Sequence, residues 1–186
     1  MKRLFDLVLA VLVSSCLFIP IVCVAIVVKV TSKGSVLYWS DRVGKENRIF
    51  SMPKFRSMKA DTPAVATHLL QDPENRLTPI GGVLRRSSLD ELPQLWSVFK
   101  GDMSFVGPRP ALFNQDDLIK QRTEKCVHLL PVGLTGWAQV NGRDELPIAA
   151  KVELDVEYMN RRSFWFDIYI LWLTFIKVVR RDGVSH

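Results

Sequence analysis

Apolar residues dominate the two ends of the chain, and polar residues are more frequent between them. Residues 7–28 carry no charge and would make about 33 Å of helix, which is long enough to cross a bilayer. Pro20 interrupts this run and removes a helical hydrogen bond, and basic residues flank both of its ends. We therefore predict two helical arms, 7–19 and 21–28, that enter one leaflet and return, within an anchor of residues 1–33.

Other interpretations of this apolar run are a single membrane crossing, a cleaved signal peptide and a lipoprotein box ending at Cys16. The run is long for a signal peptide and lacks a clear small-x-small end. The residues after Cys16 stay apolar, whereas a mature lipoprotein begins with a polar tether. A re-entrant anchor, broken at Pro20, is therefore the favoured prediction.

Residues 34–186 are predicted to form one catalytic domain of class α+β, compact and mostly helical with a small sheet. Short extended segments are expected at 36–39 and 49–55, around a turn that contains Gly44 and Asn47. The remaining expected elements are a loop with a short helix at 61–79 and helices at 80–86, 89–99, 112–126 and 148–158.

The last predicted helix, residues 163–181, begins at Ser163, is rich in tryptophan and tyrosine, and ends in basic residues. These residue types favour the bilayer interface, so we expect an interfacial amphipathic helix; a buried core helix is the alternative.

The composition narrows the class of partner. The chain has 186 residues, 48% of them hydrophobic, and a formal net charge of +6. This positive charge suits anionic lipid, a phosphorylated substrate or nucleic acid. Nucleic acid ranks last, because we find no arginine-rich stripe, zinc-finger spacing or RNA-binding aromatic signature. The three cysteines show neither metal-ligand spacing nor a disulfide framework.

Residues 84–110 carry the densest candidate chemistry. Asp90 and Glu91 lie off the apolar stripe, Arg85 precedes them, and Arg109 follows between two prolines. Arginine pairs with phosphate in a planar, two-pronged way, and an adjacent aspartate suits a nucleophile or a metal ligand. The alternative is a capping box, in which Ser88 caps a helix and Glu91 bonds back to its N–H.

Several multi-residue blocks of the chain, in one order, resemble the bacterial sugar transferase family, the monotopic phosphoglycosyl transferases. The blocks are residues 54–58, 85–110, 133–143 and 153–158. The resemblance covers nearly the whole chain and implies a re-entrant membrane helix broken at a proline. The usual Ser-Pro of that break is Ile19-Pro20 here.

The resemblance implies transfer of a phosphosugar from a UDP-sugar to undecaprenyl phosphate, with release of UMP, as the first membrane-committed step of bacterial surface glycan assembly. Asp90 would form the covalent aspartyl phosphosugar and contact Mg²⁺, and Glu91 would act as general base. The chain resembles the small stand-alone members, which favours an N-acetylated amino sugar. The alternatives are a membrane-docked hydrolase of nucleotide-sugar or lipid phosphates and a noncatalytic scaffold.

The expected substrate-binding residues extend beyond the two acids. Four basic residues are candidates for phosphate charge, three residues after Gly136 offer amide and guanidinium groups for a sugar or base, and one acid lies on a helix face with Tyr158. They are Lys54, Arg56, Arg85, Arg109, Gln139, Asn141, Arg143 and Asp155. The expected location is the cytoplasmic face of the bacterial inner membrane, in one leaflet. A second copy of the chain and downstream glycosyltransferases stay open as protein partners.

Overall fold

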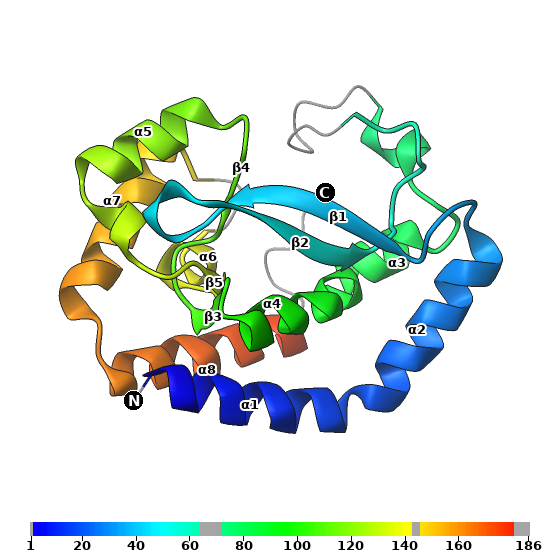
Figure 1. Ribbon diagram of the computed structural model, residues 1–186, viewed down its shortest axis with the longest axis horizontal. Coiled ribbons are helices and arrows are strands. Elements are labelled where there is room, and N and C mark those ends of the chain that lie inside the picture. Colours follow the sequence, from blue (N-terminus) through cyan, green and yellow to red (C-terminus); the bar gives the residue numbers. More distant parts are fainter. Residues whose placement is uncertain (1, 64–71, 143–145, 181–186) are drawn as a thin grey trace.

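The computed structural model describes residues 2–63, 72–142 and 146–180 and confirms the α+β class. Figure 1 shows most of the helices beneath and beside a thin layer of strands. The helices are α1 (Lys2–Cys16), α2 (Phe18–Thr31), α3 (Gly81–Arg86), α4 (Leu95–Lys100), α5 (Asp116–Glu124), α6 (Trp137–Val140), α7 (Ile148–Arg161) and α8 (Phe164–Arg180). Short 3-10 helices are η1 (Lys45–Asn47), η3 (Pro73–Arg76), η4 (Leu89–Gln94) and η5 (Val127–Leu129).

Two small sheets complete the fold. β1 (Leu37–Val43) pairs antiparallel with β2 (Ile49–Phe55) as the predicted hairpin, and β1 also pairs with β4 (Ala111–Leu112). The second sheet joins β3 (Ser104–Val106) to β5 (Gly133–Thr135) in parallel. Within the described residues most of the predicted elements are confirmed, with shifted ends: the first strand runs on to Val43, and the helix expected at 112–126 begins only at Asp116. Residues 64–71 of the loop expected at 61–79 lie outside the described residues.

The N-terminal apolar run forms two helices bent by 64°. No single described helix is long and apolar enough to span a membrane, whereas this bent pair meets the length and composition together. The break lies at Leu17, three residues before the predicted position, and Pro20 falls in the first turn of α2. A proline ring clashes with the carbonyl four residues earlier, so the helix ends upstream of it, and a proline is tolerated within a first turn.

The outer ends of this helix pair pack on the domain. Ala10 of α1 belongs to the main core with Val98, Val106 and Ile170, and Figure 1 shows α1 running beside α4 and α8. Near the end of α2, Val24 and Val28 pack with Phe55 of β2 and Leu84 of α3.

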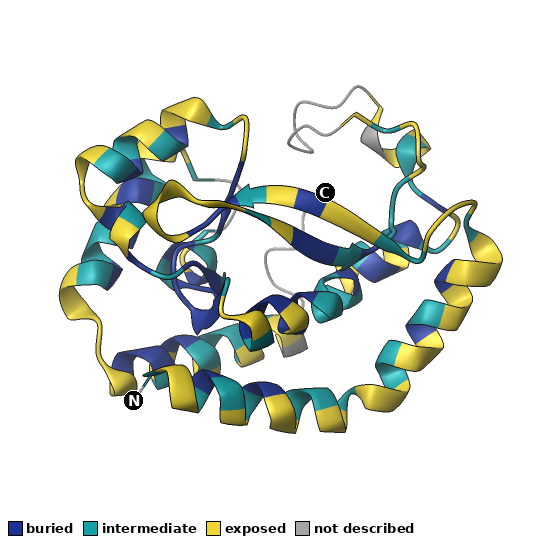
Figure 2. Cartoon of the chain, in the orientation of Figure 1, coloured by how far each residue is buried: buried dark blue, intermediate teal, exposed yellow. Residues whose placement is uncertain are grey.

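Around the bend, the side chains of the pair face outward. The exposed fractions are 57% at Leu12, 65% at Phe18 and 73% at Ile19. Figure 2 shows exposed residues recurring along both helices up to the bend. Each helix of the pair therefore packs one face on the domain and exposes apolar side chains along its length, including at the bend.

The C-terminal helix α8 has two faces. Phe166, Asp167 and Ile170 are buried against the domain, whereas Trp165 is 77% exposed and Trp172 56% exposed. Ser163 caps the helix as predicted, because its Oγ accepts a hydrogen bond from the Phe166 N–H at 3.2 Å. The amphipathic prediction is therefore confirmed for the described part of this helix, and residue 181 lies outside it.

Candidate active site

The chain between α3 and α4 turns sharply and exposes neither acid fully. Ser88 adopts a left-handed conformation with φ of 55°, and its side chain makes no capping hydrogen bond. The capping box is therefore wrong, and Glu91 uses its carboxylate elsewhere. Leu89 and Leu92 point into the cluster formed with Val24 and Val28 of α2, so this segment lies directly against the anchor.

Glu91 binds two cations from distant parts of the chain. Its Oε1 accepts a hydrogen bond from Lys54 Nζ at 2.8 Å and another from Arg109 Nη2 at 2.9 Å. Burial alone would raise the pKa of Glu91, but Arg109 and Lys54 together hold that pKa well below its usual value. Glu91 therefore stays ionised and keeps both cations beside Asp90.

Asp90 differs from its neighbour in having a buried carboxyl group to which no described residue donates a hydrogen bond. Burial raises its pKa, and the negative charge of Glu91 adds to this, against the opposing effect of Lys54, Arg85 and Arg109. A carboxyl group with a raised pKa and no donor among the described residues is typical of a site of chemistry.

The remaining phosphate candidates divide between two places. Arg85 reaches Met58 Sδ at 3.4 Å and acts electrostatically on Asp90, so α3 delivers it to the acids as predicted. Arg56 instead donates to Ser35, with Nε at 2.8 Å from the carbonyl and Nη2 at 2.7 Å from the hydroxyl. Arg56 therefore secures the chain just after α2, and no contact among the described residues joins it to Asp90.

The three candidates for a sugar or base have separate surroundings. Gln139 has both amide atoms buried without a hydrogen-bond partner among the described residues. Asn141 is exposed and donates from Nδ2 to the Trp137 carbonyl at 2.8 Å, at the end of α6. Arg143 lies outside the described residues. Gln139 is thus the one of the described pair whose amide is buried without a partner among the described residues.

Asp155 lies beneath the surface. It is 1% exposed and accepts two hydrogen bonds from Arg122, a residue that the sequence analysis did not single out. A signal for Arg122 was present, since it follows the buried Leu118 by four positions and therefore shares its helix face. A charged residue on the apolar stripe of a helix predicts a buried partner.

The donor set at Asp90 suits Mg²⁺ held jointly with a substrate. No group of three or more His, Cys, Asp or Glu side chains able to hold a metal is found in the described part of the chain. Mg²⁺ commonly binds one or two carboxylates together with substrate phosphates and water. Asp90 offers one such carboxylate, whereas that of Glu91 is already bound to two cations.

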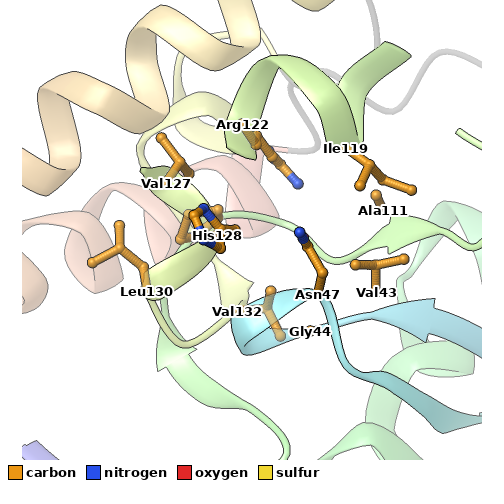
Figure 3. A pocket seen from close by; sticks show the side chains of 11 residues that line it. Val43, Gly44, Asn47, Ala111, Ile119, Arg122, Val127, His128, Leu130 and Val132 are labelled. Atoms are coloured by element: carbon orange, nitrogen blue, oxygen red, sulfur yellow. The ribbon is translucent and has the colours of Figure 1, made fainter. Parts of the chain in front are cut away.

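A pocket elsewhere lies between η1, α5 and η5 (Figure 3). Its lining is mainly apolar, with Asn47, Arg122 and His128 as the polar contributors. None of the acids or cations described around Asp90 lines it. This pocket and the candidate chemistry around Asp90 therefore do not coincide.

An acid pair surrounded by lysine and arginine side chains, next to an apolar helix pair, suits the site of a group-transfer enzyme. Comparison with known protein families agrees with this class of enzyme, because the family model described as bacterial sugar transferase matches residues 1–181. The chain belongs to the bacterial sugar transferase family and is a transferase.

Curated relatives support this assignment. The chain is 41% identical over its whole length to an uncharacterized sugar transferase EpsL of Bacillus subtilis and spans 90% of that protein. It is 40% identical, over 95% of its length, to a UDP-glucose:undecaprenyl-phosphate glucose-1-phosphate transferase of Escherichia coli, of which it spans 40%. It is 36% identical, over 98% of its length, to a UDP-N-acetylgalactosamine-undecaprenyl-phosphate N-acetylgalactosaminephosphotransferase of Aeromonas hydrophila, of which it spans 44%.

Proposed function

We propose that this transferase moves a phosphosugar from a UDP-sugar to undecaprenyl phosphate and releases UMP. The observation that carries the proposal is the contrast between the acids: Asp90 is buried and unbonded among the described residues, whereas Glu91 holds Lys54 and Arg109 beside it. Relatives that act on UDP-glucose and UDP-N-acetylgalactosamine name the donor and acceptor classes.

Asp90 is the nucleophile of the first step. A carboxylate oxygen attacks the β-phosphorus of the UDP-sugar, and the bond from that phosphorus to the bridging oxygen breaks, so UMP leaves with the bridging oxygen. A phosphate oxygen of the polyprenyl phosphate then attacks the same phosphorus and releases the Asp90 carboxylate. Two steps are needed because the donor is water-soluble and the acceptor is a lipid.

Glu91 organises the cations that receive the phosphate charge. Because the pKa of Glu91 is held well below its usual value, this carboxylate is a weak proton acceptor at neutral pH. Its contacts instead fix Lys54 and Arg109, whose donors then face charge that develops on the phosphate oxygens. A positioning role therefore fits Glu91 better than the expected role as general base.

Mg²⁺ is part of the proposal, with Asp90 as its protein ligand. When bound, the ion neutralises phosphate oxygens and orients the diphosphate. Lys54, Arg85 and Arg109 supply further positive charge around the same carboxylate.

The bent helix pair is proposed as a re-entrant anchor in one leaflet, on the cytoplasmic face of the inner membrane. The start of α1 is bound to the domain: Lys2 Nζ donates to the Asp167 carboxylate, and Asp6 accepts from the Phe105 N–H at 3.0 Å. A helix held in this way does not place its N-terminus across the bilayer. The anchor instead brings the lipid phosphate to the segment of Leu89 and Leu92.

The sugar is proposed to be an N-acetylated amino sugar, and a donor panel tests this choice. Purified protein with Mg²⁺ is given UDP-glucose, UDP-galactose, UDP-N-acetylgalactosamine and UDP-N-acetylglucosamine, with and without undecaprenyl phosphate, and UMP release and intact protein mass are measured. The expected result is UMP and a phosphosugar adduct without acceptor, and sustained turnover with it. Sustained turnover without acceptor would identify a hydrolase, and no UMP from any donor would contradict the proposal.

A further inference from the structure

A buried ion pair lies behind the active site. Arg122, near the end of α5, is 8% exposed, and Asp155, in α7, is 1% exposed. The Arg122 Nε and Nη2 both donate to Asp155 Oδ2, at 2.9 and 2.7 Å. This cover places the Asp155 carboxylate out of reach of a substrate, so its expected role in substrate binding does not fit the geometry.

The third nitrogen of Arg122 reaches toward the site. Its Nη1 donates to the backbone carbonyl of Arg109 at 2.7 Å. The Arg109 side chain, from the same residue, donates to Glu91. Hydrogen bonds therefore link Asp155 to Arg122, Arg122 to the Arg109 backbone, and the Arg109 side chain to Glu91.

The segment around Arg109 depends on such support. Pro108 and Pro110 have no N–H, so residues 108–110 are held mainly through their carbonyls. Pro108 accepts from the Gly133 N–H at 2.9 Å, and Pro110 accepts from Arg42 Nη1 at 3.4 Å. The short bond from Arg122 fixes the middle carbonyl, which belongs to the residue whose side chain enters the site.

We propose that Arg122 and Asp155 are positioning residues that hold the Arg109 backbone so that its guanidinium reaches Glu91 and the substrate phosphate. The inference rests on the proposed function for the role of Arg109. Arginine suits this task because its planar fork binds a carboxylate and a carbonyl at once in fixed directions. Asp155 orients the Arg122 guanidinium, and the remaining N–H group of that guanidinium holds the backbone carbonyl of Arg109.

A buried ion pair is weak evidence for stability, because well-packed apolar residues of similar volume often replace one without loss. An apolar replacement of the pair can therefore test a positioning role without unfolding the protein. The variant Arg122→Met with Asp155→Leu removes both charges together and leaves no unpaired charge. We expect its thermal unfolding temperature to stay near that of wild type while UMP release falls on the order of 100-fold, mainly in kcat, as for a misplaced catalytic contact.

The control is an exposed pair of an arginine and a carboxylate. Arg48 binds Glu46 at 2.9 Å, with side chains 82% and 42% exposed. Arg48→Met with Glu46→Gln should leave UMP release unchanged. If the double variant of Arg122 and Asp155 does not fold, Arg122→Lys replaces it in the test. Lysine keeps the positive charge but gives up either the contact to Asp155 or the contact to the Arg109 carbonyl. A folded variant with wild-type kcat would overturn the proposal.

Coupling to Arg109 distinguishes positioning from a general structural role. In an Arg109→Ala background, the Arg122 and Asp155 changes should cause little further loss of UMP release, whereas independent roles would give additive losses.

Thermal unfolding gives a second test that needs no reaction. Glu91→Gln should lower the unfolding temperature less in the Arg122 and Asp155 variant than in wild type. Wild-type protein without UMP release would contradict the proposed function alone, and additive unfolding shifts would contradict the positioning role.

Discussion

Two clusters of charged residues among the described residues have similar members and different degrees of hydrogen bonding. We call Lys2, Asp6, Tyr158 and Asp167 the anchor cluster, and Lys54, Asp90, Glu91 and Arg109 the site cluster. In the anchor cluster, Asp6 accepts from Ser104 and Phe105, and Asp167 accepts from Lys2 and Tyr158. In the site cluster, Glu91 is similarly bonded, whereas no described residue donates to Asp90.

This difference in hydrogen bonding is what the proposed roles lead us to expect, because the anchor cluster holds the fold and Asp90 is the proposed nucleophile. Burial, with the neighbouring Asp167, raises the pKa of Tyr158, so its hydroxyl stays protonated and donates to that carboxylate. Burial also raises the pKa of Asp90, but there the carboxylate gains no described hydrogen bond in return. Asp90 therefore lacks the protein donors that Asp6 and Asp167 have, which suits its proposed role as nucleophile.

Asp90→Asn is the change with the largest expected effect on activity. Removal of the nucleophile should lower UMP release on the order of 10⁴-fold or more, with or without lipid acceptor, and abolish the phosphosugar adduct in the intact mass. The pKa of Asp90 is raised in the folded state, so its ionised form disfavours folding at neutral pH. The unfolding temperature of the variant should therefore match or exceed that of wild type. A variant with near-normal turnover would remove Asp90 from the mechanism.

Glu91→Gln should lower both activity and stability, because Glu91 is the bonded member of the site cluster. Loss of the ionic contacts to Lys54 and Arg109 should reduce the free energy of unfolding by about 1.5–3 kcal/mol and UMP release by about 100-fold. Chemical denaturation and initial rates measure the two effects. An unchanged free energy of unfolding would contradict the stabilising role of these contacts.

The pH dependence of that stability has a definite sign. The pKa of Glu91 is lowered in the folded state, so its contribution is present above the pKa of an ordinary glutamate and is lost as the pH falls toward the lowered value. Wild-type protein should therefore lose more stability on acidification than Glu91→Gln. Equal losses would show that other carboxyl groups dominate acid unfolding.

Lys2→Met should affect stability more than chemistry, which is the opposite pattern to Asp90→Asn. The Asp167 side chain is 7% exposed and would lose its ionic partner. The expected cost is about 1–3 kcal/mol in the free energy of unfolding, while UMP release per folded molecule stays within about twofold of wild type, a change of less than 0.5 kcal/mol in the barrier. Normalising rates by the folded fraction measures this. A large loss of kcat in fully folded protein would place Lys2 in the catalytic machinery.

The sequence was most informative where the relevant contacts are local. Residues 84–110 bring Arg85, Asp90, Glu91 and Arg109 into one site within a short length of chain, and local spacing sufficed to single them out. The anchor cluster joins Asp6 to Phe105, far apart in sequence, and no periodicity reveals such a pair. The helix position of Arg122 indicated a buried partner, but that partner, Asp155, lies in another helix and no local pattern identified it.

The position of the helix break shows a second limit of the sequence. Pro20 marks a break, but the strained group is the carbonyl of Cys16, so the helix ends there. The alternative capping box at Ser88 was wrong because Glu91 binds Lys54 and Arg109 instead of the Ser88 N–H. The capping box and the active site share the same local pattern, and only the positions of Lys54 on β2 and Arg109 after β3 distinguish them.

Pro20→Leu should have the smallest effect, although it removes the cause of the break. A continuous helix would regain about 3 kcal/mol at most from the loss of an interior proline. Straightening would pull α1 from the domain and break the bonds of Lys2, Arg3 and Asp6, each of which contributes about 1 kcal/mol or more. The domain contacts outweigh the helical gain, so the N-terminus should stay on the side of the active site.

Labelling of an N-terminal cysteine in sealed vesicles measures the side on which the N-terminus lies. Pro20→Leu combined with Lys2→Met and Asp6→Asn should shift part of the population across the membrane. An N-terminus already on the far side in wild-type protein would contradict the re-entrant anchor itself, and a far-side N-terminus in Pro20→Leu alone would show that the proline, rather than the anchor cluster, maintains the bend.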